Sequence, residues 1–164
     1  MNEDNYSQTV RRELVHKRAV SEVLVTSVVN QGGAWLVHAQ LPRLHSFHSD
    51  GVGRQRNYYD PLLVLEAFRQ GGCIAGSHLF YDAPADARHT VRMYELSVVD
   101  FDHLECGPEM LDLELNIVAQ KEFRRDDHGA VHGLEVRAVA SHQAPRPWSW
   151  RRRSTGCRWR SGIG

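Results

Sequence analysis

The segment from Asp60 to Leu79 constrains the fold most, because it predicts a long helix with too much apolar surface to be exposed to solvent. Asp60 can accept hydrogen bonds from the free amide groups of the first turn, and Pro61 suits the first helical position. A broad arc of apolar side chains runs along about five turns: Leu62, Leu63, Leu65, Phe68, Ile74 and Leu79. Such a helix has to be covered by other elements.

The segments before this helix are typical of a β-hairpin. Glu22–Val29 is rich in β-branched residues, and Ala34–Leu41 alternates apolar and mixed side chains with a period of two. Between them, Asn30–Gly33 has the composition of a turn.

Three further segments after the helix have strand-like patterns. Thr90–Phe101 alternates loosely, Met110–Phe123 alternates clearly, and Leu134–Val139 pairs naturally with the latter across the polar loop Arg124–Gly133. An antiparallel sheet packed around one helix would bury that helix, so the fold class predicted is α+β.

The net charge of zero conceals two unlike segments. Residues 1–142 hold 14 basic and 20 acidic side chains, a net −6, whereas residues 143–164 hold 6 Arg and no acid. We expect residues 1–13 to be a disordered N-terminus, 14–142 to form a single domain, and 143–164 to be a disordered basic tail. The tail has the composition of a GC-rich gene read out of frame. The alternative is a functional tail that binds phosphates and stacks on bases, but nucleic acid is not the expected partner.

The composition favours a cytoplasmic protein. No run of about 18 apolar residues is present, so no membrane span is expected. The N-terminus lacks the basic and apolar regions of a signal peptide. Cys73, Cys106 and Cys157 lie far apart and make no disulfide framework, which suggests a reducing compartment.

The polar side chains of the helix form the first candidate site. Glu66, Arg69 and Gln70 share one face at spacings of three and four residues. A Glu on an otherwise apolar helix is expected to have a raised pKa, which suits general acid–base catalysis. The alternative is a structural ion pair between Glu66 and Arg69. Gly71 and Gly72 would weaken the helix unless another backbone or a ligand approaches closely there.

The loop from Pro42 to Tyr59 is long and contains the second candidate site, His45-Ser46-Phe47-His48. His45 can act as a general base or as a hydrogen-bond donor near neutral pH. His45 and His48 have metal-ligand spacing, but no third ligand accompanies them, so no metal is predicted. The alternative is a polar loop with solvated histidines.

Together these segments resemble the A-factor biosynthesis hotdog-domain family. The resemblance rests on Val15-His16-Lys17, on Pro42–Phe47, and on Asp60–Leu63 followed by Glu66 and Arg69-Gln70, in matching order and spacing. It extends over roughly residues 15–139 and implies a hotdog fold, an antiparallel sheet wrapped around one long central helix.

The resemblance also implies a reaction. Members resemble γ-butyrolactone signal synthases, which transfer a β-ketoacyl group from an acyl-carrier-protein thioester to a hydroxyl of dihydroxyacetone phosphate. Glu66 and His45 would then be the catalytic residues. Substrate would be bound by Arg69, Gln70, Phe47, Gly71 and Gly72. No cofactor is implied beyond the acyl-carrier-protein or CoA thioester donor.

Typical members carry two hotdog repeats, and this chain carries one. The resemblance therefore implies a homodimer or a second hotdog repeat, and truncation by a frameshift near the basic tail is expected. Two other functions stay open: a hotdog thioesterase or dehydratase, and a non-catalytic unit that binds acyl ligands or dimerises.

Overall fold

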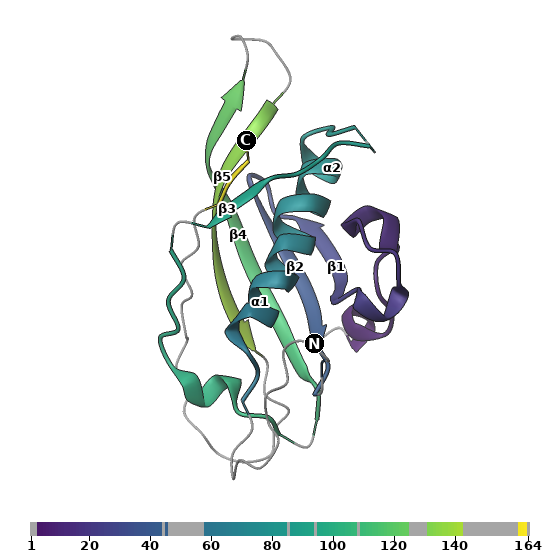
Figure 1. The fold of residues 1–164 in the computed structure, drawn as a ribbon, viewed down its shortest axis with the longest axis vertical. Coiled ribbons are helices and arrows are strands. Elements are labelled where there is room, and N and C mark those ends of the chain that lie inside the picture. The colour runs from purple at the N-terminus through teal and green to yellow at the C-terminus, as the bar shows by residue number, and fades with distance from the viewer. Residues whose placement is uncertain are drawn as a thin grey trace.

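The computed structural model describes residues 3–43, 45, 58–84, 86–93, 95–107, 109–124, 131–142 and 161–163. Its centre is an antiparallel sheet with one long helix across a face (Figure 1). The strands are β1 (Val25–Asn30), β2 (Ala34–Leu41), β3 (Val91–Met93), β4 (Leu111–Arg124), β5 (Val131–His142) and β6 (Ser161–Ile163), in the order β1-β2-β4-β5-β6-β3. The α+β hotdog prediction is confirmed. Within the described residues no helix has the length and apolarity needed to cross a bilayer.

The central helix consists of α1 (Pro61–Phe68), a π-helical segment η4 (Arg69–Ala75) and α2 (Gly76–Phe80), which follow one another without a break. The Asp60 carboxylate accepts a hydrogen bond of 2.8 Å from the amide of Leu62, so the predicted cap is present. Most of the apolar arc is buried against the sheet, but Leu62 and Leu79 are each 47% exposed. These two side chains point away from the core, so the predicted burial is incomplete.

Glycines let the helix lie close to the sheet. A Cβ on Gly71 would overlap a methyl group of Val37, and one on Gly76 would lie 2.9 Å from the indole of Trp35. Val37 and Trp35 both lie on β2 and are buried. The close approach predicted at Gly71 is therefore made by the protein's own sheet, and Gly76 adds a second one that was not predicted.

The strand predictions are confirmed except for one. β1 and β2 form the predicted hairpin, and β4 and β5 pair along most of their lengths. The prediction for Thr90–Phe101 is largely wrong, because only Val91–Met93 is a strand. The chain then enters a 3-10 turn, η5 (Phe101–Leu104), which starts where the Asp100 carboxylate accepts a 3.0 Å hydrogen bond from the amide of Asp102.

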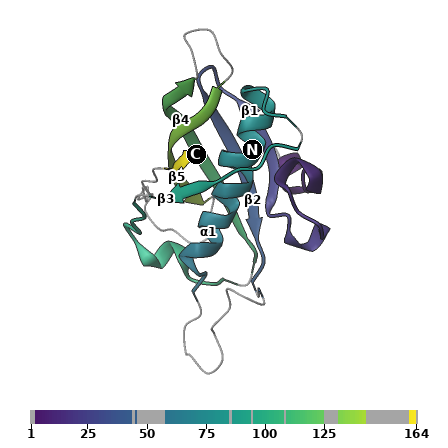
Figure 2. The same ribbon diagram turned by 45° about the horizontal axis from the view of Figure 1, so that its top comes forward.

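The prediction of a disordered N-terminus is wrong for the described residues 3–13. They form the 3-10 turns η1 (Glu3–Tyr6) and the start of η2 (Arg12–Val15), beside β1 (Figure 2). The Tyr6 hydroxyl donates to the carbonyl of Leu113, and the amide of Val10 donates to the carbonyl of Val25. A third turn, η3 (Val20–Glu22), leads into β1. These hydrogen bonds to backbone carbonyls fix a polar segment that has little apolar signal of its own.

Most of the basic tail lies outside the described residues. Within 161–163, β6 pairs with both β5 and β3. This part of the tail is therefore a strand, contrary to the expected disorder.

Candidate functional site

Glu66 lies in the second turn of α1 and binds three donor side chains. Arg69 donates two hydrogen bonds of 2.7 Å, one to each carboxylate oxygen. Gln70 donates to Oε1 at 2.9 Å, and the Lys17 ammonium lies 3.0 Å from the same oxygen. The helical spacing brings Arg69 and Gln70 to Glu66, as predicted, whereas Lys17 arrives from the N-terminal segment after η2.

The donors decide the charge of Glu66. Burial acts to raise the pKa of this carboxyl, but the hydrogen bonds from Arg69, Gln70 and Lys17 outweigh it and lower the pKa to about 2. The expectation of a raised pKa is therefore wrong, because Arg69 from the same helix and Lys17 from the N-terminal segment both reach the buried carboxylate. The carboxylate is ionised at neutral pH, and its bond with Arg69 is the ion pair foreseen as the alternative.

Gln70 links the central helix to the segment that leads into β1. Its side chain is fully buried, and its amide donates to the carbonyl of Glu22 as well as to Glu66. Its carbonyl accepts a 2.9 Å hydrogen bond from the amide of Leu24. Both of its amide protons are thus bound within the protein.

Gly71 and Gly72 face the sheet. The space next to Gly71 is filled by Val37 and Val25, and the space next to Gly72 by Ile117 and Phe68. In this chain the room at both glycines is taken up by core side chains.

Residue types and helical spacing alone do not identify Lys17 as a site residue. Its only sequence signal is its place in the Val15-His16-Lys17 motif of the family resemblance. In the structure the Lys17 side chain is 19% exposed and that of Arg69 is 32% exposed. Two cations at the surface therefore share one carboxylate, with Glu22 3.4 Å from the Lys17 ammonium as a second acidic neighbour.

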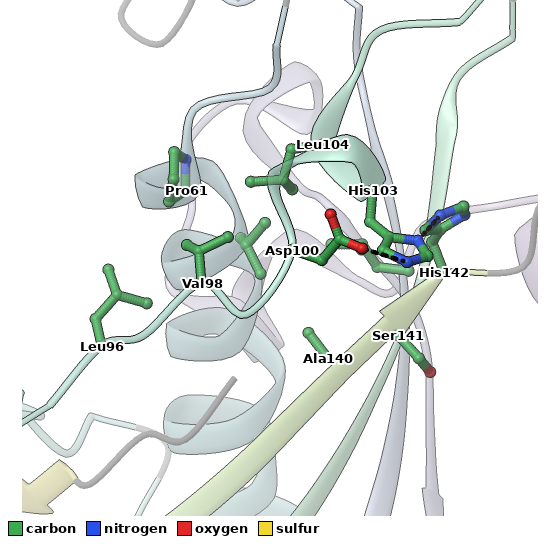
Figure 3. Close-up of a pocket in the computed structure, with 11 residues that line it drawn as sticks. Pro61, Leu96, Val98, Asp100, His103, Leu104, Ala140, Ser141 and His142 are labelled. Carbon is green, nitrogen blue, oxygen red and sulfur yellow. Dashed lines mark hydrogen bonds and ion pairs between the residues drawn. The ribbon is translucent and has the colours of Figure 1, made fainter. Parts of the chain in front are cut away.

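A mostly apolar pocket lies on another side of α1, between the helix, the segment 96–104 and the end of β5 (Figure 3). The side chains that line it are Pro61, Val64, Leu96, Val98, Asp100, His103, Leu104, Leu113, Ala140, Ser141 and His142. This lining suits an aliphatic chain, with polar groups confined to one end.

The polar end of this pocket is a chain of three titratable side chains. His103 Nδ1 lies 2.7 Å from His142 Nε2, and His103 Nε2 lies 3.6 Å from the Asp100 carboxylate (Figure 3). Burial, together with the neighbouring His103, lowers the pKa of His142. Because η5 and the end of β5 are far apart in sequence, only the fold brings them together.

The pocket and Glu66 lie on opposite sides of the helix. Val64 lines the pocket, and Glu66 follows it by two residues, about 200° around the helix axis. Figures 1 and 2 show the N-terminal segment and the segment 95–104 on opposite flanks of α1. A single chain therefore does not bring the carboxylate and the pocket together.

His45 is half-buried and follows the end of β2. Phe47, Ser46 and His48 lie outside the described residues. The roles expected of His45 and Phe47 stay predictions.

Comparisons with known proteins agree with this fold. The sequence profile of the A-factor biosynthesis hotdog domain matches residues 2–143. A curated relative from Streptomyces virginiae, named 2-oxo-3-(phosphooxy)propyl 3-oxoalkanoate synthase, is 33% identical over 127 residues. The match covers 73% of this chain and 39% of the relative, so the chain spans about two fifths of that protein's length. The profile match over most of the chain shows that it belongs to the A-factor biosynthesis hotdog family.

Proposed function

We propose that this chain forms a β-ketoacyltransferase with a second hotdog unit. The donor is an acyl-carrier-protein thioester, the acceptor is a hydroxyl of dihydroxyacetone phosphate, and the reaction belongs to γ-butyrolactone autoregulator biosynthesis in the cytoplasm. The family match supports the proposal, and so does the name of the Streptomyces virginiae relative, which describes an ester of a 3-oxoalkanoate with a phosphooxypropyl group.

The structural observation that carries the proposal is the pair of cations on Glu66. Arg69 and Lys17 are partly exposed and can both bind a phosphate, Arg69 through two parallel hydrogen bonds. A phosphate bound there competes with Glu66 for the same donors. As those hydrogen bonds weaken, the pKa of Glu66 rises from about 2, and the carboxylate becomes a stronger base when the acceptor binds.

The proposed transfer balances in protons and bonds. Glu66 takes the proton of the acceptor hydroxyl while that oxygen attacks the thioester carbonyl. The new C–O bond forms, the C–S bond breaks, and the proton passes from Glu66 to the departing thiolate. His45 is proposed to orient the acceptor hydroxyl, with Phe47 beside it.

The apolar pocket is the proposed place of the acyl chain. Because it lies opposite Glu66 on the same helix, one substrate can contact both features only if a second unit contributes one of them. This geometry favours a homodimer, or a second repeat in a longer protein, as the active form. Gln70, Gly71 and Gly72 then support the site from within, by holding the helix to the sheet.

The test offers the purified protein β-ketoacyl-acyl carrier protein and dihydroxyacetone phosphate, with mass spectrometry to identify the product. The expected product is the phosphate ester, made by a species of twice the 18.7 kDa chain mass in sedimentation. Glu66→Gln should lower kcat by about 10²–10⁴-fold. Arg69→Lys should raise KM for the phosphate acceptor about tenfold or more, because the two parallel hydrogen bonds are lost.

Matched controls are Glu109→Gln and Arg11→Lys, which change exposed side chains of the same types. Release of the free β-ketoacid would favour a thioesterase instead, and an enoyl product would favour a dehydratase. Acyl binding without turnover, unchanged in Glu66→Gln, would show a non-catalytic unit.

A further inference from the structure

Three histidines from three separate segments converge beside the C-terminal part of the central helix. His16 follows η2, His78 lies in α2, and His89 precedes β3. One ligand atom from each ring lies within 4.8 Å of the other two, and the ring centroids are 5.1 to 5.3 Å apart. We propose that His16, His78 and His89 form a binding site for a divalent transition-metal ion of the zinc type.

The spacing is close to what such an ion needs. Zinc–nitrogen bonds of about 2.0–2.1 Å in a tetrahedron place the ligand nitrogens about 3.4 Å apart. His16 Nε2 and His78 Nε2 are already 2.9 Å apart. The His89 ligand atom lies within 4.8 Å of the other two, so it has to move closer to them to complete the set.

His78 is held in the form that binds metals. Its Nδ1 lies 2.9 Å from the carbonyl oxygen of Ala83, which can only accept, so Nδ1 carries the proton. In the neutral ring Nε2 then carries a lone pair, which accepts the hydrogen bond from His16 Nε2 and would bind the metal ion in its place. A backbone carbonyl on the opposite ring nitrogen is the usual support of a metal-binding histidine.

His89 supplies an independent observation. Its Nδ1 is buried and has no hydrogen-bond partner among the described residues. A buried polar atom without a partner is rare in native structures and calls for an explanation. A metal ion bound by this ring, or a small shift that aims it at the ion, provides one.

His16 is also positioned at some energetic cost. Its backbone has φ 55°, in the left-handed region that non-glycine residues seldom occupy, and its amide bonds back to the carbonyls of Arg12 and Glu13. This conformation turns the chain so that the imidazole lies beside His78. Strained backbone of this kind is concentrated at functional sites.

The surroundings leave one coordination position open. Arg69 lies near His16 and His89, and its charge is paired with Glu66. Because His16 is exposed, the fourth position of a tetrahedral ion would face solvent.

The test uses the full chain without a histidine tag, freed of metal by chelator and titrated with Co²⁺ and then Zn²⁺. A tetrahedral Co²⁺ spectrum at one ion per chain, displaced by Zn²⁺, is expected. His16→Asn and His89→Asn should each weaken binding about 10–100-fold. Asn tolerates the left-handed backbone at position 16, so that variant should stay folded, as circular dichroism will show.

The matched control is His132→Ala, which removes an exposed histidine of β5 and should bind as the parent chain does. Cys157→Ser should also bind normally, which excludes the tail thiol as a ligand. At the same zinc concentration, the Tm should rise more for the parent chain than for His16→Asn. The proposal is overturned if the parent chain binds no ion, or if the folded His16→Asn and His89→Asn proteins bind as tightly as the parent. None of these readouts depends on acyl transfer, so they separate this proposal from the enzymatic one.

Discussion

Arg69 binds Glu66 through two parallel hydrogen bonds of 2.7 Å within a single turn of the central helix. Lys17 reaches the same carboxylate from the N-terminal segment. Glu66 therefore ties the helix to a segment that precedes the sheet, and it does so only while it is ionised.

The charge of Glu66 should make stability depend on pH in the acid range. The pKa of Glu66 is about 2 in the folded chain against 4.5 in the unfolded chain. Its contribution to the free energy of unfolding is therefore present above about pH 4.5 and is lost as pH falls towards 2. At about 1.4 kcal/mol for each pKa unit, the contribution is about 3 kcal/mol. Urea unfolding at a series of pH values should show this loss in the parent chain. The Glu66→Gln protein should lack it, and the exposed Glu109→Gln should keep it; equal pH profiles for all three would refute the coupling.

Gly71→Ala should destabilise the fold by about 1–3 kcal/mol, because its new Cβ would overlap Val37 on β2. Gly107→Ala serves as the control, since a Cβ there meets no atom within 4 Å. Its free energy of unfolding should change by less than about 1 kcal/mol. The urea midpoints of the two variants make the comparison, and a similar midpoint for both would contradict the packing argument.

Gln70→Met should lower the free energy of unfolding by about 1–3 kcal/mol, because it leaves the buried Leu24 amide without its acceptor. Hydrogen exchange at Leu24 should become faster than in the parent chain, which a general loss of packing would not single out. The control Gln31→Met changes an exposed turn residue. An unchanged exchange rate at Leu24 would show that the hydrogen bond from its amide to Gln70 does not protect it.

His142 should titrate below the usual histidine range of about 6.5. Burial disfavours its charged form, and the ring of His103 adds a second, smaller effect. The unfolded chain binds this proton at a higher pH than the folded chain does. The free energy of unfolding therefore decreases as pH falls from the usual histidine range to the lowered pKa of His142. NMR titration of the ring carbon measures this directly. His103→Ala should move the midpoint partly back upward, and no movement would show that the rings do not interact.

The sequence predicted the central helix and its partners well because those signals are local. Asp60 and Pro61 define the helix start, and the alternation in Met110–Phe123 follows from one strand face packing on a core. Thr90–Phe101 failed because its weak alternation competes with the Asp100 cap, which starts a turn instead. The N-terminal segment was missed because backbone hydrogen bonds to the sheet hold it, and a sequence carries no pattern for those.

The candidate site likewise has features that the sequence predicts and features that depend on the fold. Helical spacing alone placed Arg69 and Gln70 next to Glu66, because residues three and four apart share a face. The direction of the pKa shift of Glu66 was predicted wrongly, because this shift depends on how many donors the fold brings to the carboxylate. One of these donors, Lys17, comes from outside the helix. The charge difference between the domain and its basic tail was likewise visible in the sequence, but the pairing of β6 with β5 was not.

Periodicity, caps and motif order are properties of neighbouring residues, so the buried helix, the antiparallel strands and the family were predictable from the residues alone. Which distant groups meet depends on the folded chain. His103 faces His142, and His16 faces His78, across separations of 39 and 62 residues. Such contacts are set by the path of the chain around the sheet, and the chemistry of a side chain follows from the charges and the solvent that this path leaves around it.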